Sequence, residues 1–195
     1  MISLNTHQDA QKAIRWLQDY FKSLKKWVGV VDDACTNMDW TMFEANRAST
    51  SLGNGYQDNT QCVMNWISRH YYRNGHDHSL LVYLPLATKS QDDDEVYCYF
   101  SLVHHDQAAP EDGIPTFPKD WLTGAAIVDG MRSHSPEQVV PLSEAFTRKA
   151  FRSAIAIHVC KIPMFAFGET TISVKEKVED ILRRLGDGST PPQEA

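Results

Sequence analysis

The chain has 195 residues, of which 42% are hydrophobic and 23% charged, so it is long enough and apolar enough for one folded core and is not wholly disordered. Its formal charge of −6 offers no general attraction to phosphate backbones, so nucleic-acid binding is not expected. The longest apolar run, near residues 80–86, is too short for a membrane span, and the first residues have neither the basic start nor the apolar run of a signal peptide.

Residues 8–28 are predicted to form an amphipathic helix. Its main apolar stripe repeats at steps of three and four residues and consists of Ile14, Leu17, Phe21, Leu24 and Val28. Trp16, Tyr20 and Trp27 form an aromatic strip beside it, so that apolar side chains cover nearly half of the helix surface. This apolar surface is wide enough for the helix to pack against two other structural elements. The strip is therefore either core or a protein-binding patch.

The next segment is predicted to be mainly helical as far as residue 73. A short helix is expected over residues 38–48, followed by a turn at Gly53-Asn54-Gly55. A second helix would carry the apolar positions Val63, Trp66, Ile67, His70 and Tyr71 and end at Asn74-Gly75.

Residues 78–104 are predicted to form a β-hairpin, with strands over 78–86 and 95–104 and a polar turn at 88–94. Even-numbered positions are apolar in both strands and must face the same side of the sheet, so paired residue numbers sum to an even value. A turn centred near Gln91 puts His78 opposite His104 and His76 opposite Asp106. His105 and Asp77 are then excluded from this group, because they face the other side.

The remaining elements complete an α+β pattern. A proline-rich loop is expected over residues 107–120, a strand over 122–128, a helix over 143–151 and a central strand over 154–162. A last helix should begin with a capping box formed by Ser173 and Glu176 and end at Gly186. The prediction is one α+β domain over residues 1–186, with a flexible tail at 187–195. Its sheet, mixed or antiparallel, contains the 78–104 hairpin and is backed by N- and C-terminal amphipathic helices.

The histidine end of the hairpin is the candidate site for metal chemistry. Imidazole and carboxylate groups suit a divalent metal such as zinc or manganese, with His76, His78, His104 and Asp106 as ligands. His158 could join them if the later strand neighbours the hairpin. The alternative is that these polar side chains only mark strand ends that emerge into solvent. No H-E-x-x-H motif supports the metal interpretation.

The four cysteines, Cys35, Cys62, Cys98 and Cys160, are scattered without a C-x-x-C pair, which indicates free thiols and a cytoplasmic location. The first functional hypothesis is an intracellular protein that needs no cofactor and acts by protein–protein interaction, as a regulator, inhibitor or immunity-type factor. The second is a metal-dependent hydrolase or nuclease-like enzyme that uses the histidine cluster. The sequence leaves the partner, the substrate and the oligomeric state open.

Overall fold

A computed structural model describes residues 7–43, 66–86, 95–106, 122–151 and 154–188. Its elements in chain order are α1 (His7–Asn37), β1 (Thr41–Met42), β2 (Trp66–Tyr72), β3 (His78–Pro85), β4 (Tyr97–His105), α2 (Leu122–Met131), β5 (Val139–Pro141), α3 (Glu144–Ala150), β6 (Ala154–Pro163), the 3-10 helix η2 (Met164–Phe167) and α4 (Thr171–Gly188).

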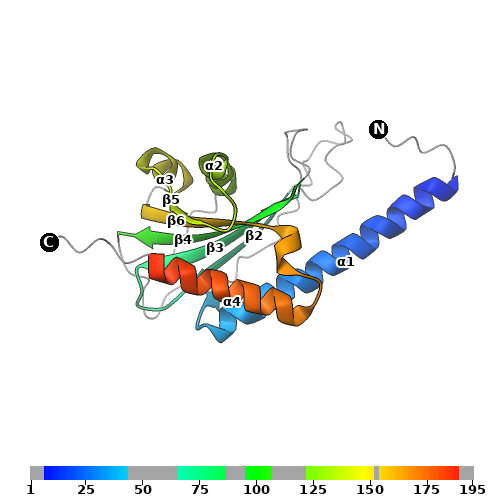
Figure 1. Ribbon diagram of the computed structural model, residues 1–195, viewed down its shortest axis with the longest axis horizontal. Helices are drawn as coiled ribbons and strands as arrows, with labels where there is room; N and C mark the ends of the chain where they lie inside the picture. The colour runs from blue at the N-terminus through cyan, green and yellow to red at the C-terminus, as the bar shows by residue number, and fades with distance from the viewer. Residues whose placement is uncertain (1–6, 44–65, 87–94, 107–121, 152–153, 189–195) are drawn as a thin grey trace.

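One six-stranded antiparallel sheet organises these elements, in the order β1-β2-β3-β4-β6-β5. Helices α1 and α4 cover one face, and α2 and α3 cover the other (Figure 1). The predicted α+β fold, with its hairpin and its N- and C-terminal helices, is confirmed. The strand expected over 154–162 is also confirmed, because β6 lies between β4 and β5 inside the sheet.

The register of the hairpin follows the predicted parity. His78 pairs with His104, Leu80 with Leu102, and Val82 with Phe100. Even-numbered side chains of β3 and β4 pack with α1 and α4 in one hydrophobic cluster. Odd-numbered side chains such as Leu81 pack with α2 in a second cluster on the opposite face. Both faces of the hairpin are therefore buried, which makes a slip of one residue costly.

The helix predicted to carry Ile67 and Tyr71 is wrong, because residues 66–72 form strand β2. These two residues are buried and four positions apart, a spacing that fits one helix face and one strand face equally well. The aromatic and β-branched residues of the segment favour the strand. The strand expected over 122–128 is also wrong, since this apolar run is helix α2. Short continuous apolar runs do not distinguish the two structures by periodicity.

The first helix is longer than predicted and continues to Asn37. Asp39 then takes a left-handed conformation, with φ of 63°, and the short strand β1 follows at Thr41. The helix predicted over 38–48 is therefore wrong over its described part. Its remainder lies outside the described residues, as do the turn at 53–55, the hairpin turn at 88–94 and the proline-rich loop at 107–120.

Helix α4 is capped by Thr170, three residues before the predicted cap Ser173. The Thr170 hydroxyl accepts a hydrogen bond from the Ser173 amide, and the Ser173 hydroxyl accepts one from the Thr170 amide, at 3.0 and 3.2 Å. This reciprocal pair is a capping box in which Ser173 is the third helical residue rather than the cap. At the other end the helix passes Gly186 and includes residues 187 and 188 of the predicted tail; residues 189–195 lie outside the described part.

Over the described ranges, none of the helices combines the length and the apolar character that crossing a bilayer would require.

Gly124 allows α2 to lie close against the sheet, and this generates a stability prediction. A β-carbon at Gly124 would lie 2.1 Å from a ring carbon of Tyr83. We expect Gly124→Ala to lower the free energy of unfolding by about 1–3 kcal/mol, the usual cost of overpacking. Urea denaturation measures the change.

Gly29→Ala is the matched control, because a β-carbon at this exposed position in α1 meets nothing within 4 Å. It should raise the unfolding free energy by up to about 1 kcal/mol through helix propensity. A Gly124→Ala protein as stable as Gly29→Ala would contradict the close packing of α2 on Tyr83.

Candidate functional site

Four imidazoles lie in a row across one end of the sheet. His78 begins β3, His104 is in β4, His158 is in β6, and His76 lies in the turn before β3. Ring centroids are 5.1 Å apart for His76 and His78, 6.0 Å for His78 and His104, and 5.5 Å for His104 and His158. We call these four residues the histidine row. It lies on the sheet face covered by α1 and α4, because its strand members occupy even-numbered positions.

Asp106 does not take the place predicted for it. The β4–β6 register shifts between His104 and His105, and the His105 amide donates to the Asp77 carbonyl oxygen at 2.7 Å. The charge of Asp106 acts on His105, and no interaction found among the described residues links it to the histidine row. The acidic neighbour of the row is Asp77, whose carboxylate lies 3.2 Å from Nδ1 of His78. The exclusion of Asp77 from this group was therefore wrong.

His105 lies apart from the row, as predicted. Its Nε2 is 2.8 Å from the Ser79 hydroxyl, and its ring packs edge-on against Phe151 with centroids 6.3 Å apart. Phe151 belongs to the hydrophobic cluster on the α2 side of the sheet. The strand parity therefore separates neighbouring histidines onto opposite faces.

Burial weakens the basicity of the inner part of the row. Desolvation is the main cause that lowers the pKa of His104, and the neighbouring His158 and His78 rings lower it further. Desolvation also lowers the pKa of His158. Nε2 of His104 and Nδ1 of His158 are buried and make no hydrogen bond with the described residues. Both rings are therefore neutral near pH 7.

The row does not amount to a metal centre in the described part of the chain. Among these residues, no group of three or more histidine, cysteine, aspartate or glutamate side chains is arranged to hold a metal ion. The zinc or manganese site predicted on His76, His78, His104 and Asp106 therefore gains no support.

The cysteines of the described ranges are buried free thiols. Cys35, Cys98 and Cys160 form no disulfide, whereas Cys62 lies outside these ranges. Burial raises the pKa of the Cys160 thiol to about 11. Since the thiolate is the reactive form, Cys160 is poorly suited to act as a nucleophile beside His158.

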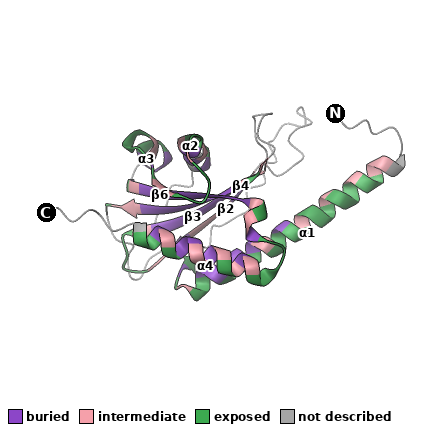
Figure 2. Cartoon of the chain, in the orientation of Figure 1, coloured by how far each residue is buried: buried purple, intermediate pink, exposed green. Residues whose placement is uncertain are grey.

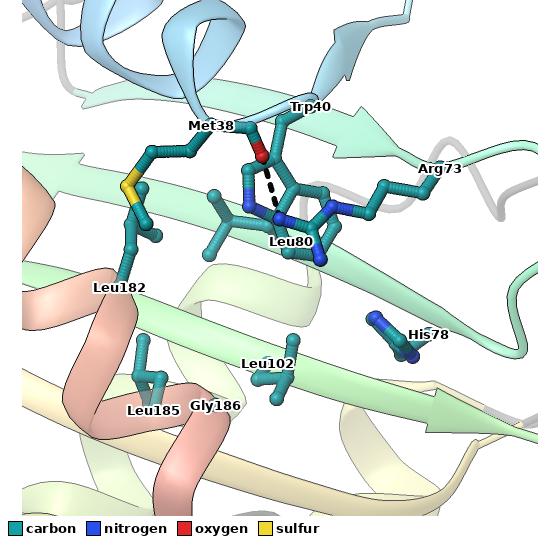
Figure 3. Close-up of a pocket in the computed structure, with 9 residues that line it drawn as sticks. All are labelled: Met38, Trp40, Arg73, His78, Leu80, Leu102, Leu182, Leu185 and Gly186. Atoms are coloured by element: carbon teal, nitrogen blue, oxygen red, sulfur yellow. Dashed lines mark hydrogen bonds between the residues drawn. The ribbon is translucent and has the colours of Figure 1, made fainter.

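A pocket of about 230 Å³ adjoins the histidine row on the same face of the sheet. It lies between the sheet, the end of α1 and the last turns of α4 (Figure 3). Its lining residues are Met38, Trp40, Arg73, His78, Leu80, Leu102, Leu182, Leu185 and Gly186. In the close-up, Arg73 and His78 lie toward one end, whereas Leu182 and Leu185 lie toward the other. The pocket therefore has a polar end and an apolar end.

Two contacts hold Arg73 in place at the polar end of the pocket. Its guanidinium carbon lies 4.4 Å from the centroid of the Trp40 ring, and Nη2 donates a hydrogen bond of 2.6 Å to the Met38 carbonyl oxygen. The indole is itself buried and packs edge-on against His78, with centroids 5.6 Å apart. Sequence reasoning missed Arg73 and Trp40, because each follows a segment that was assigned the wrong structure or length.

The aromatic strip of α1 divides into two parts. Trp27 belongs with the core: its ring packs edge-on against buried Phe167, with centroids 5.4 Å apart, and its indole nitrogen is buried. Trp16 and Tyr20 stack on each other at 5.5 Å but remain 65% and 36% exposed. By their numbers both belong to the N-terminal half of α1. Figure 2 shows that this half extends beyond the sheet. The structure thus separates Trp27 from the other two predicted interaction residues.

Searches with this chain against protein-family models, curated proteins and solved structures find no match.

The lowered pKa values of the buried histidines predict how stability depends on pH. A histidine whose pKa is lower in the folded than in the unfolded state binds fewer protons when folded, so stability falls as the pH drops below the unfolded value near 6.5. His70 acts in the same direction, because burial lowers its pKa to about 4. We therefore expect the urea concentration at the unfolding midpoint to be lower at pH 5.5 than at pH 7.5.

His104→Gln should reduce this pH dependence without abolishing it, since His70 and His158 remain. The comparison is the difference in urea midpoint between the two pH values, measured for the unmodified protein and the variant. An equal difference in both proteins would show that His104 does not contribute.

Proposed function

We propose that this protein acts by protein–protein interaction, as a regulator or inhibitor, through the outer half of α1, defined as residues 9–22. The observation that carries the proposal is the exposure of large apolar side chains there. Ile14 is 55% exposed, Trp16 65% and Tyr20 36%. Contiguous apolar surface of this kind is typical of interaction sites, and aromatic residues dominate the energetics of protein interfaces.

The apolar pattern of α1 supports the proposal because it runs through both halves of the helix. Apolar residues follow alternating steps of four and three residues at Ala10, Ile14, Leu17, Phe21, Leu24, Val28, Val31 and Cys35. The last four are buried in the domain. The first four repeat the same heptad spacing toward the end of the helix that extends past the sheet. Ile14 is exposed there, whereas Phe21 is partly buried against the core. A heptad stripe is the pattern with which one helix packs on another.

The charges of the outer half indicate what kind of partner fits. The positions that flank the stripe carry uncharged residues, Gln11, Ala13, Gln18 and Tyr20. Lys12, Arg15, Asp19 and Lys22 fall on the opposite side of the helix. A partner helix could therefore lie along the stripe without meeting like charges at its flanks. We infer that the partner is a different protein that presents an amphipathic helix, a common mode of recognition.

The Trp16→Ala/Tyr20→Ala double variant tests this proposal. Immobilised full chain should capture a protein from an extract of its source cells, and the purified partner should bind the double variant at least about tenfold more weakly, as loss of an aromatic hot spot implies. Arg15→Ala, on the opposite side of the helix, should bind normally. Circular dichroism should be unchanged in both variants. Equal binding by the double variant, or no captured protein, would contradict the proposal.

Trp27→Ala should act differently, because Trp27 packs on Phe167 inside the domain. Truncating this side chain should lower the free energy of unfolding by about 2 kcal/mol or more, as expected for loss of a largely packed aromatic ring. Urea denaturation provides the measurement. If the free energy of unfolding changes by less than about 0.5 kcal/mol and partner binding is weaker, Trp27 belongs to the interaction surface and not to the core.

A further inference from the structure

We propose that the pocket between Trp40, Arg73 and α4 binds a small monocarboxylate with an apolar body. The carboxylate would pair with the Arg73 guanidinium, and the body would lie among Leu102, Leu182 and Leu185. This binding site is separate from the outer half of α1 and does not depend on the function proposed for that surface.

Arg73 carries the inference because it is a half-buried cation without a carboxylate partner among the described residues. Its Nε is buried and makes no hydrogen bond with them. Arg69, in strand β2 shortly before Arg73, also has a buried Nε without a hydrogen bond to the described residues, but this Nε lies 3.4 Å from the Asp32 carboxylate. Burying a charged group is unfavourable unless it is paired and hydrogen-bonded. A bound anion would supply the pairing that the neighbouring arginine obtains from the protein.

The guanidinium is also preorganised for an anion. Trp40 supports its face, and the Met38 carbonyl occupies one of its five N–H groups. The planar fork formed by the remaining N–H groups matches the two oxygens of a carboxylate. Trp40 is only 5% exposed, so the indole ring that supports the guanidinium is itself packed in the core. Little conformational freedom would be lost on binding, which favours affinity.

The other end of the pocket determines the body of the ligand. Leu182 and Leu185 project from α4 and Leu102 from β4, opposite the Arg73 and His78 end (Figure 3). The volume of about 230 Å³ is below the roughly 300–1,000 Å³ of pockets for drug-sized ligands. An apolar cavity of about 150 Å³ holds benzene in another protein. One aromatic ring or a short alkyl chain with a carboxylate therefore fits the available space.

The charge of the surroundings favours a monoanion. Arg73 is the pocket's one permanent cation among the described residues. Desolvation lowers the pKa of the adjacent His104, so this ring adds no charge at neutral pH. A phosphate monoester would bring close to two negative charges to a single guanidinium. A carboxylate brings one.

Phenylacetate is a suitable probe, with 2-phenylethanol as its uncharged analogue and acetate as the anion without an apolar body. Titration to about 20 mM covers the millimolar or tighter dissociation constants expected for a ligand of this size. Two-dimensional ¹H–¹⁵N spectra of the full chain report on the pocket through the Arg73 Nε–H and the Trp40 indole N–H. We expect phenylacetate to shift both signals in a saturable way, and each control compound to bind at least tenfold more weakly.

Two variants and a matched control locate the site. Gly186 lines the pocket, and a β-carbon there meets nothing within 4 Å, so Gly186→Phe should occupy the space and abolish phenylacetate binding without unfolding the protein. Gly29→Phe places the same side chain at an equally open helical glycine outside the pocket and should leave binding unchanged. Arg73→Gln should weaken binding at least tenfold, and circular dichroism verifies that it folds.

Each result of these binding experiments either supports or overturns the proposed carboxylate site. No shift with phenylacetate, or equal binding of 2-phenylethanol, would overturn the proposal. Undiminished binding to Gly186→Phe would place the ligand elsewhere and overturn it too. If Arg73→Gln fails to fold, the comparison of Gly186→Phe with Gly29→Phe still decides the location, and the comparison of the three compounds still decides the role of charge. Partner capture by the outer half of α1 is measured separately, so either proposal can fail alone.

Discussion

The pairing of β3 with β4 is the constraint on which the rest of the structure depends. Both strands are buried on both faces, so each residue belongs to one of two cores according to the parity of its number. The α1–α4 core receives Leu80 and Leu102, whereas the α2 side receives Leu81 and Val103. A slip of one residue would exchange the two sets. The same pairing aligns His78 with His104 and places Leu80 beside Leu102 in the pocket wall.

Long periodic patterns made much of this fold predictable from the sequence. The alternation in the hairpin predicted its register, and the three- and four-residue steps predicted α1 and α4. Short segments were not predictable in this way: Ile67 and Tyr71 are four residues apart and suit either structure, and α2 is a continuous apolar run. The pocket was missed for a related reason. Trp40 and Arg73 meet only because α1 reaches Asn37 and residues 66–72 form a strand, and neither feature has a local sequence signal.

Helix α1 shows that one sequence pattern can have two structural outcomes. Its inner half is held in the domain by buried side chains and by Asp32, which accepts a 2.6 Å hydrogen bond from the hydroxyl of fully buried Tyr71 and lies beside Arg69. The outer half has the same heptad spacing but extends past the sheet. The aromatic strip could not be divided into core and surface from periodicity, because the division depends on where the sheet ends. Trp27 lies before that limit and Trp16 beyond it.

The contact between α1 and α4 joins the two ends of the described chain, and this has a consequence for the order of folding. During synthesis the apolar stripe of α1 emerges well before α4, the helix that packs against it. The β2–β3–β4 meander pairs strands that are close in sequence and can form while synthesis continues. The hydrophobic cluster that buries Val28 and Val31 is complete only after Val178 and Leu182 of α4 have been synthesised. A chain that stops before α4 would therefore leave the inner half of α1 open to the chaperones and aggregation-prone contacts that a nascent protein meets.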